Sequence, residues 1–260
     1  MLFFLSVASF FGIFVDITYA RETASMAAQG IGQDIVDLFL VVPAVISSLI
    51  MMRRNKKIAT LIFGGLIFYI LYSFIIYSMG VHFNLMFLVY CLTLGTSSYV
   101  FIFYFYSLSR LDVRAWFHDK TPNQGLAILF IVVAAMFYTL WLKDIVPAII
   151  KNEVPRSVTD YDLLVNPVHV IDIAFALPGL IITAVLLLRK HNLGYILAPI
   201  VLVFVIVLTI SLAAMVIMTR IKGISEDASI AIIFIILSVV SIGYLWAFLR
   251  KIKPLHYSTT

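Results

Sequence analysis

Long, unbroken apolar runs are the feature that most constrains how this chain can fold, and residues 126–142 and 193–219 are two examples. Neither run alternates apolar and polar residues, as the strands of a membrane barrel do. Only 12% of the residues are charged, whereas a soluble domain carries about 25%. Because backbone groups in lipid can be hydrogen-bonded only within helices or closed barrels, the sequence predicts an all-α polytopic membrane helix bundle.

The predicted bundle has about eight transmembrane helices in a single domain that covers residues 1–260. A helix needs about 20 residues to cross ~30 Å of hydrocarbon. The first apolar run could instead be a signal peptide that ends at Ala20, but no basic residue precedes it and Asp16 interrupts it, so we favour a retained helix. The predicted segments are 2–20, 33–52, 58–79, 85–108, 126–147, 168–188, 193–218 and 228–249.

Lysine and arginine residues gather in four of the connections between these helices, and this gives the expected orientation. Such residues are enriched in cytoplasmic loops. With the N-terminus inside, 12 of the 18 Lys and Arg residues fall on the cytoplasmic side, in residues 53–57, 110–120, 189–190 and 250–253. We therefore expect both termini in the cytoplasm. The formal charge of +5 is interpreted as a topology signal, with the lipid bilayer as partner and no nucleic acid.

A weak internal repeat relates two parts of the chain. Residues 36–54 and 171–189 align at an offset of 135, and the alignment pairs Asp37 with Asp172 and Pro43 with Pro178. Such a repeat predicts two parallel four-helix halves, residues 1–110 and 125–250, as some transporters have. Because apolar segments resemble one another by default, both a duplication and a chance similarity stay open.

Four aspartates are predicted to lie at a common depth near the outer ends of helices. The 15 residues that follow Asp37, up to Met52, make about 23 Å of helix, so Asp37 is expected about one turn below the outer hydrocarbon boundary. A carboxylate in lipid costs about 2–3 kcal/mol unless it faces protein or water, which favours one shared pocket. Alternatively, each acid only stabilises a helix start, by about 0.3–1 kcal/mol. The predicted binding residues are Asp16, Asp37, Asp144, Asp172, His82 and His169.

Two further patterns bear on the chemistry of this pocket. A proline follows both Asp37 and Asp172 by six residues and cannot donate a backbone hydrogen bond, so helix carbonyls beside each carboxylate become free, as in broken transporter helices. His169 and Asp172 share a helical face and, with carbonyl oxygens, would suit a divalent metal. No cofactor is identified by the sequence.

The third predicted helix carries a polar face near its middle, formed by Tyr69, Tyr72 and Ser73. Hydroxyl groups in lipid need hydrogen-bond partners. We therefore expect this face to pack inward, either as a helix–helix contact or as the wall of a substrate pocket.

Residues 77–90, Tyr-Ser-Met-Gly-Val-His-Phe-Asn-Leu-Met-Phe-Leu-Val-Tyr, and the two helices with aspartate six residues before proline carry a family resemblance. Together they resemble a group of uncharacterised prokaryotic multi-pass integral membrane proteins. The resemblance implies a bacterial or archaeal cytoplasmic membrane and brings no activity, cofactor or catalytic residue.

Three functional hypotheses follow from these patterns. We favour a small-solute or cation- or proton-coupled transporter with an outward-facing acidic pocket, because mutual repulsion among clustered carboxylates suits proton coupling. One alternative is a membrane-embedded metal-dependent enzyme with His169 and Asp172 as ligands. The other is a non-catalytic membrane scaffold or sensor subunit, in which the acids would point apart.

Overall fold

The computed structural model describes residues 1–54, 56–225 and 227–253. The described residues contain no β-strand, so the predicted all-α fold is confirmed. The elements are α1 (Leu2–Phe14), η1 (Asp16–Tyr19), α2 (Ala24–Val36), η2 (Asp37–Val41), α3 (Val42–Met52), α4 (Lys57–Gly80), α5 (Phe87–Ser109), η3 (Arg114–Trp116), α6 (Asn123–Lys151), α7 (Arg156–Thr159), α8 (Pro167–Ile171), η4 (Asp172–Ala176), α9 (Leu177–Leu188), α10 (Asn192–Ile221) and α11 (Ser229–Leu249).

Seven helices in the described part of the chain are long and apolar enough to cross a membrane, where the sequence predicted about eight. The difference lies in the first segment. α1 has only 13 residues, or about 20 Å of helix, which is short of ~30 Å of hydrocarbon. It ends because Val15 adopts an extended backbone, and a 3-10 turn then buries Tyr19 in the connection to α2.

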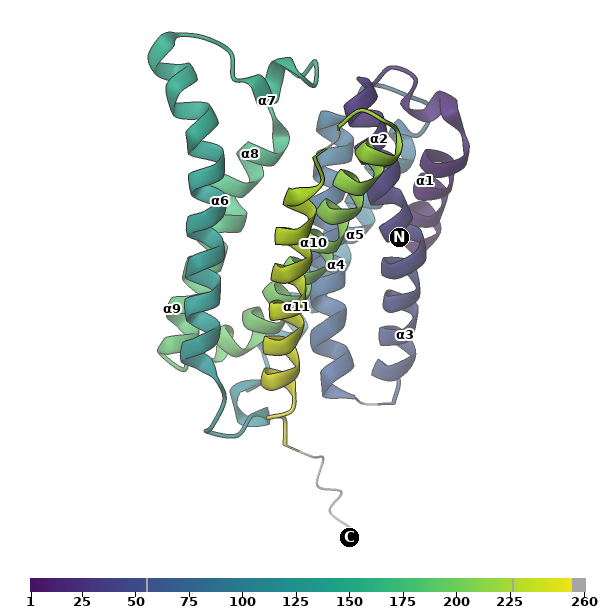
Figure 1. The fold of residues 1–260 in the computed structure, drawn as a ribbon. Coiled ribbons are helices and arrows are strands. Elements are labelled where there is room, and N and C mark those ends of the chain that lie inside the picture. The colour runs from purple at the N-terminus through teal and green to yellow at the C-terminus, as the bar shows by residue number, and fades with distance from the viewer. Residues whose placement is uncertain (55, 226, 254–260) are drawn as a thin grey trace.

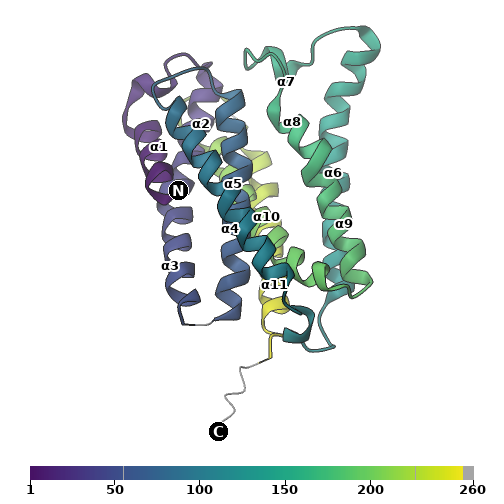
Figure 2. The same ribbon diagram turned by 180° about the vertical axis from the view of Figure 1, so that it is seen from behind.

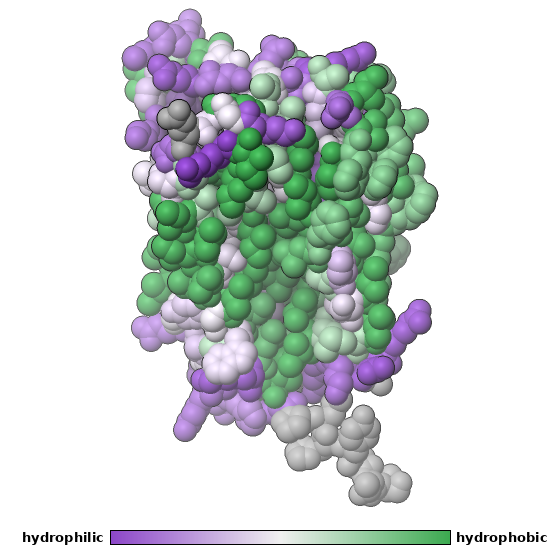
Figure 3. Space-filling model, turned by 45° about the vertical axis from the view of Figure 1, so that its right-hand side comes forward, coloured by the Kyte–Doolittle hydropathy of each residue, from purple (hydrophilic) through white to green (hydrophobic). Residues whose placement is uncertain are grey.

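The connections rich in Lys and Arg lie together at one end of the bundle, which we call the basic end (Figure 1). There the His118 N–H donates to the Lys251 carbonyl at 2.9 Å, and Asn192 Nδ2 donates to the Leu111 carbonyl at 2.8 Å. Between the basic end and the opposite end runs a hydrophobic belt (Figure 3). Seven apolar spans and this belt identify a multi-pass membrane protein. That the basic end is cytoplasmic stays a prediction, and residues 254–260 at the C-terminus lie outside the described residues.

The bundle consists of two groups of helices, seen side by side in Figures 1 and 2. We call α6, α7, α8, η4 and α9 the limb, and the remaining elements the body. The limb joins the body where α9 packs against α10 and where α8 packs against α4. α4 and α10 pack against each other at the centre of the body.

The packing of the two predicted halves corresponds for the elements after α1 and after α6, whereas α1 packs on α2 and α5 and α6 packs on α9. α2 packs against α10 and α8 packs against α4, while α3 contacts α4 and α9 contacts α10. α5 packs beside α4, and α11 packs beside α10. A parallel duplication would produce these pairings, and the duplication itself stays a prediction.

Gly65 allows α4 and α10 to approach closely at the centre of the bundle. A Cβ atom at this position would lie 2.4 Å from Val203 Cβ and 2.7 Å from the Ile200 carbonyl oxygen. Real Cβ contacts are not that short, and small residues are what permit such crossings in membrane helices. The position therefore requires glycine.

Candidate functional site

Three tyrosines on α4 donate hydrogen bonds to three buried aspartates from neighbouring helices. These tyrosines face α2 and η2 in the body on one side and η4 in the limb on the other, so the polar face expected on the third predicted helix does pack inward. The pairs are Tyr69–Asp37 at 2.8 Å, Tyr72–Asp172 at 2.7 Å and Tyr77–Asp34 at 3.1 Å.

Asp37 is fully buried near the middle of the bundle. Its Oδ1 accepts the Tyr69 hydrogen bond, and the Tyr69 hydroxyl lies 2.7 Å from Ser211 Oγ on α10. Its Oδ2 has no hydrogen-bond partner among the described residues. The predicted start of this segment at residue 33 is corrected, because α2 begins at Ala24, 13 residues before Asp37, and Thr23 caps it. Asp37 therefore lies about 20 Å along its helix, and its depth in the membrane stays a prediction.

Both Asp37 and Asp172 begin a short π-helical segment. In each case the first amide after the segment donates to the aspartate carbonyl five residues earlier: Val42 to Asp37 and Leu177 to Asp172. The proline is the second residue of the α-helix that follows. The break expected from the proline is thus a widened turn, and π-segments inside helices are frequent at functional sites.

Asp34 was not among the predicted binding residues, yet it is 1% exposed. It accepts the hydrogen bond from Tyr77, which is the last of the three tyrosines along α4 and lies farthest from the basic end. Asp34 also accepts a hydrogen bond from Tyr19 at 2.5 Å. A Cβ atom on Gly12 would lie 1.8 Å from Asp34 Oδ2, so α1 packs directly on this carboxylate. The available signal was its spacing of three residues from Asp37, which places both on one helical face.

Asp172 connects the limb to the body. Its Oδ1 accepts from Tyr72 on α4, and its Oδ2 accepts from the indole N–H of Trp141 on α6 at 2.8 Å. The Trp141 ring contacts the ring of His169, with 4.6 Å between centroids. His169 is buried, and its Nε2 has no hydrogen-bond partner among the described residues.

A cavity of about 420 Å³ opens between the limb and the body toward the opposite end. We call it the cleft pocket. Small-molecule sites occupy about 300–1,000 Å³, so its size is that of a ligand site. Its walls come from α2, α4 and α10 in the body and from α6, the α7–α8 segment and α8 in the limb. The lining residues are Met26, Gln29, Ile76, Gly80, Leu140, Trp141, Asp144, Ser157, Asp160, Tyr161, Leu163, Asn166, Pro167, Val168, His169, Leu212 and Met215.

The four predicted aspartates do not converge on this pocket. Asp144 lines it, together with the predicted His169. Asp37 and Asp172 are buried beneath it in the helix interfaces. Asp16 is exposed, because it lies on the 3-10 turn after α1 and not inside a crossing helix. The expectation of a single pocket formed by all four carboxylates is therefore corrected, while their role in binding stays a prediction.

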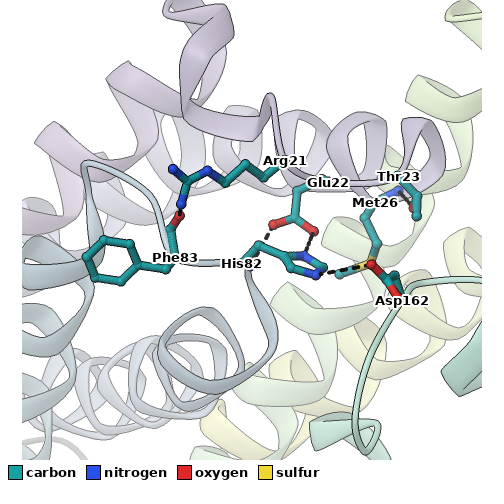
Figure 4. A network of polar contacts seen from close by, with 7 residues as sticks. All are labelled: Arg21, Glu22, Thr23, Met26, His82, Phe83 and Asp162. Atoms are coloured by element: carbon teal, nitrogen blue, oxygen red, sulfur yellow. Dashed lines mark hydrogen bonds and ion pairs between the residues drawn. The ribbon is translucent and has the colours of Figure 1, made fainter.

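His82 lies outside the cleft pocket, in the α4–α5 connection, where it joins two other connections (Figure 4). Its backbone N–H and its Nδ1 bind the two carboxylate oxygens of Glu22 at 2.7 and 3.0 Å. Its Nε2 is 3.7 Å from Asp162 in the α7–α8 segment. The hydrogen bond to Glu22 raises the pKa of His82. We call this contact the His82 junction; it ties the limb to the body beside the pocket.

The predicted metal site supplies two side chains, His169 and Asp172, from consecutive helical turns. Both Asp172 oxygens already accept hydrogen bonds from neutral donors. Within residues 1–54, 56–225 and 227–253 no group of three or more His, Cys, Asp or Glu side chains is placed to hold a metal ion. The enzyme hypothesis thus has no third side-chain ligand in this part of the chain.

A scan against protein-family models, a search of curated proteins and a search of solved structures each returned no match.

Proposed function

We propose that this membrane protein transports a small solute through the cleft pocket and couples its movement to a proton or small cation that neutralises the buried aspartates. One observation carries the proposal. Trp141 lines the cleft pocket and also donates its indole N–H to Asp172. The occupant of the pocket would thereby touch a side chain bonded to a buried carboxylate.

The charge of the buried aspartates supports coupling to a cation. In the part of the chain that the structure describes, both ion pairs involve His82, and neither includes Asp34, Asp37 or Asp172. Tyrosine and tryptophan donors orient a carboxylate but do not neutralise it. An ionised carboxylate buried without a counter-charge is very costly, so a mobile proton or small cation is the natural partner.

The contacts that would carry the coupling run from the limb to the body. Asp172 links Trp141 in the limb to Tyr72 on α4. Tyr69 lies three residues before Tyr72 on the same helix, about 4.5 Å along its axis, and donates a hydrogen bond to Asp37. A change in charge at either carboxylate would alter hydrogen bonds along one helix, and that helix faces the cleft.

The arrangement of limb and body supports alternating access. In transporters with parallel repeats, one bundle rocks against another around a central site. Here the polar contact between limb and body at Asp172–Tyr72 lies below the pocket, and the His82 junction lies at the opposite end. Between these contacts the cleft pocket has both groups of helices as its walls.

The test is coupled flux in proteoliposomes that enclose a pH-sensitive dye. A panel of amines, amino acids, sugars and carboxylates is added outside under an imposed membrane potential, and proton movement that depends on a solute is recorded. The wild-type protein is expected to give such movement with at least one solute class. Asp37→Asn, which keeps the shape and removes the ionisable group, is expected to abolish it.

Asp119→Asn is the matched control, since Asp119 is an exposed aspartate in the connection before α6 and does not line the cleft pocket. It is expected to behave like the wild-type protein. Solute-dependent proton movement that survives unchanged in Asp37→Asn would remove the proposal, as would its loss in both variants.

A further inference from the structure

The charged side chains that line the cleft pocket are acidic. Asp144 and Asp160 are its charged lining residues, and no Lys or Arg side chain is among the described residues that line it. An anionic ligand would meet two carboxylates without a compensating cation. Charge complementarity therefore favours a positively charged occupant.

Asp144 is held in a fixed orientation in the pocket wall. It accepts a hydrogen bond from the Ser157 hydroxyl and a longer one, 3.4 Å, from the Ser157 N–H. Asn166 in turn donates to the Ser157 carbonyl at 3.0 Å and caps α8 through Val168. A carboxylate oriented in this way is part of a built site, since supporting hydrogen bonds are what fix a binding group.

The remaining walls are apolar and aromatic. Met26, Ile76, Leu140, Leu212 and Met215 contribute aliphatic surface. Such walls do not suit a small inorganic ion, which needs several converging oxygen ligands. They suit an ion that carries its own apolar substituents.

Two aromatic side chains, Trp141 and Tyr161, also line the pocket. Trp is the best ring for a cation held against its face. His169, 6% exposed, completes this wall, and its Nε2 has no hydrogen-bond partner among the described residues. A polar ring atom without a partner in the wall of a cavity is an independent sign that a ligand completes the site, because buried polar atoms are normally hydrogen-bonded.

We infer that the cleft pocket binds a small organic cation, an amine or quaternary ammonium with apolar substituents, whose charged nitrogen lies between Asp144 and Trp141. The inference rests on the proposed function for the role of the pocket and adds the class of its ligand. Gln29 Nε2 on α2 donates to the Tyr161 hydroxyl at 3.4 Å, so a residue of the body helps to hold this aromatic side chain in the pocket wall.

The experiment uses benzyltrimethylammonium as the probe and isothermal titration calorimetry on the purified full chain. Neopentylbenzene, which has a neutral carbon in place of nitrogen, and benzenesulfonate, an anion, serve as comparison ligands. The cation is expected to bind, and the neutral and anionic compounds are expected to bind at least about tenfold more weakly, a difference of about 1.4 kcal/mol.

Asp144→Asn is expected to weaken binding of the cation about tenfold or more, as for a close charge pair. Asp144→Glu, which keeps the charge, is expected to retain most of the affinity, and Asp119→Asn is expected to match the wild-type protein. Melting curves identify any variant that fails to fold, and the charge-preserving variant then still decides the question.

Equal binding of the neutral compound, tighter binding of the anion, or unchanged affinity in Asp144→Asn would overturn the inference. Binding of the cation without any coupled flux would leave the inference standing and remove the proposed function. Coupled flux with another solute class, without cation binding, would remove the inference and leave the proposed function standing. If the protein in phosphatidylcholine nanodiscs binds the probe more weakly than the protein in phosphatidylglycerol nanodiscs, the natural cation is the quaternary ammonium of a lipid headgroup, and the inference stands with that source.

Discussion

Replacing Tyr69 by phenylalanine removes one hydroxyl group from the centre of the protein and leaves the ring in place. That hydroxyl donates to Asp37 Oδ1 at 2.8 Å and lies 2.7 Å from Ser211 Oγ. All three side chains are at most 1% exposed. Because Asp37 Oδ2 already has no partner among the described residues, the substitution leaves this carboxyl group without any side-chain donor there.

The size of the effect follows from two considerations. A buried polar group left unsatisfied costs about 1–3 kcal/mol. Side-chain hydrogen bonds measured within membrane proteins average about 0.6 kcal/mol and reach about 1.7 kcal/mol. Two contacts are lost here and one of them involves a carboxyl group, so we expect Tyr69→Phe to lower the free energy of unfolding by about 2 kcal/mol.

The assay is unfolding by a denaturing detergent titrated into mild detergent, followed by circular dichroism. Tyr99→Phe is the matched control, because Tyr99 is 67% exposed on α5 and an exposed substitution changes stability by about 0.5 kcal/mol or less. The double variant Asp37→Leu with Tyr69→Phe replaces both partners by apolar groups and is expected to recover part of the loss. Equal stability of Tyr69→Phe and Tyr99→Phe would refute the reasoning.

Three further predictions concern packing, the His82 junction and the link between pocket and carboxylate. Gly65→Ala is expected to cost about 1–3 kcal/mol in the same unfolding assay, as overpacking does, whereas Gly95→Ala, which meets nothing within 4 Å, should cost nothing. His82 faces Glu22 and Asp162, with Arg21 nearby on the Phe83 carbonyl; since its pKa is raised, the stabilisation from its charge is complete below about pH 6.5 and is lost as pH rises through the raised value. The free energy of local opening of residues 153–166, measured by hydrogen exchange and corrected for the intrinsic pH dependence of the exchange rate, should therefore fall with rising pH by at most about 1 kcal/mol in the wild-type protein. It should fall less in His82→Gln; an equal fall in both proteins contradicts this. Trp141→Phe removes the donor to Asp172 but keeps a ring, so the probe cation should still bind within about tenfold while coupled flux falls; full flux in this variant argues against the link.

The sequence predicted the fold well because each crossing is a local property. An apolar run of about 20 residues specifies a membrane helix without reference to the rest of the chain. The first segment departs from this rule because residues 15–20 form a turn that buries Tyr19 against Asp34, a contact between α1 and α2 that no hydropathy pattern contains. The start of α2 was missed because residues 24–32 are small and weakly apolar.

The candidate site was only partly predictable because it depends on contacts distant in the sequence. The pattern of aspartate six residues before proline located both π-helical segments, and the polar face around Tyr69 did point inward. Which aspartate meets which tyrosine follows from the packing of α4 against two other helices, which spacing does not reveal. The cleft pocket is likewise a product of how the limb sits on the body, so a common depth could not show that Asp16 lies outside it.

The claim that the charge of a carboxylate at the centre of the bundle controls the cleft is tested most directly by a distance between limb and body. Cys91 is the single cysteine in the sequence and is exposed on α5. Ile150→Cys adds a second label on the limb, at a position that is 78% exposed. Pulsed electron paramagnetic resonance in nanodiscs then gives the distribution of distances between the two labels. We predict that Asp37→Asn, which fixes this position in a neutral form, shifts the distribution and that Asp119→Asn, at an exposed position, does not. The same distribution in all three proteins, with and without benzyltrimethylammonium, would contradict the account.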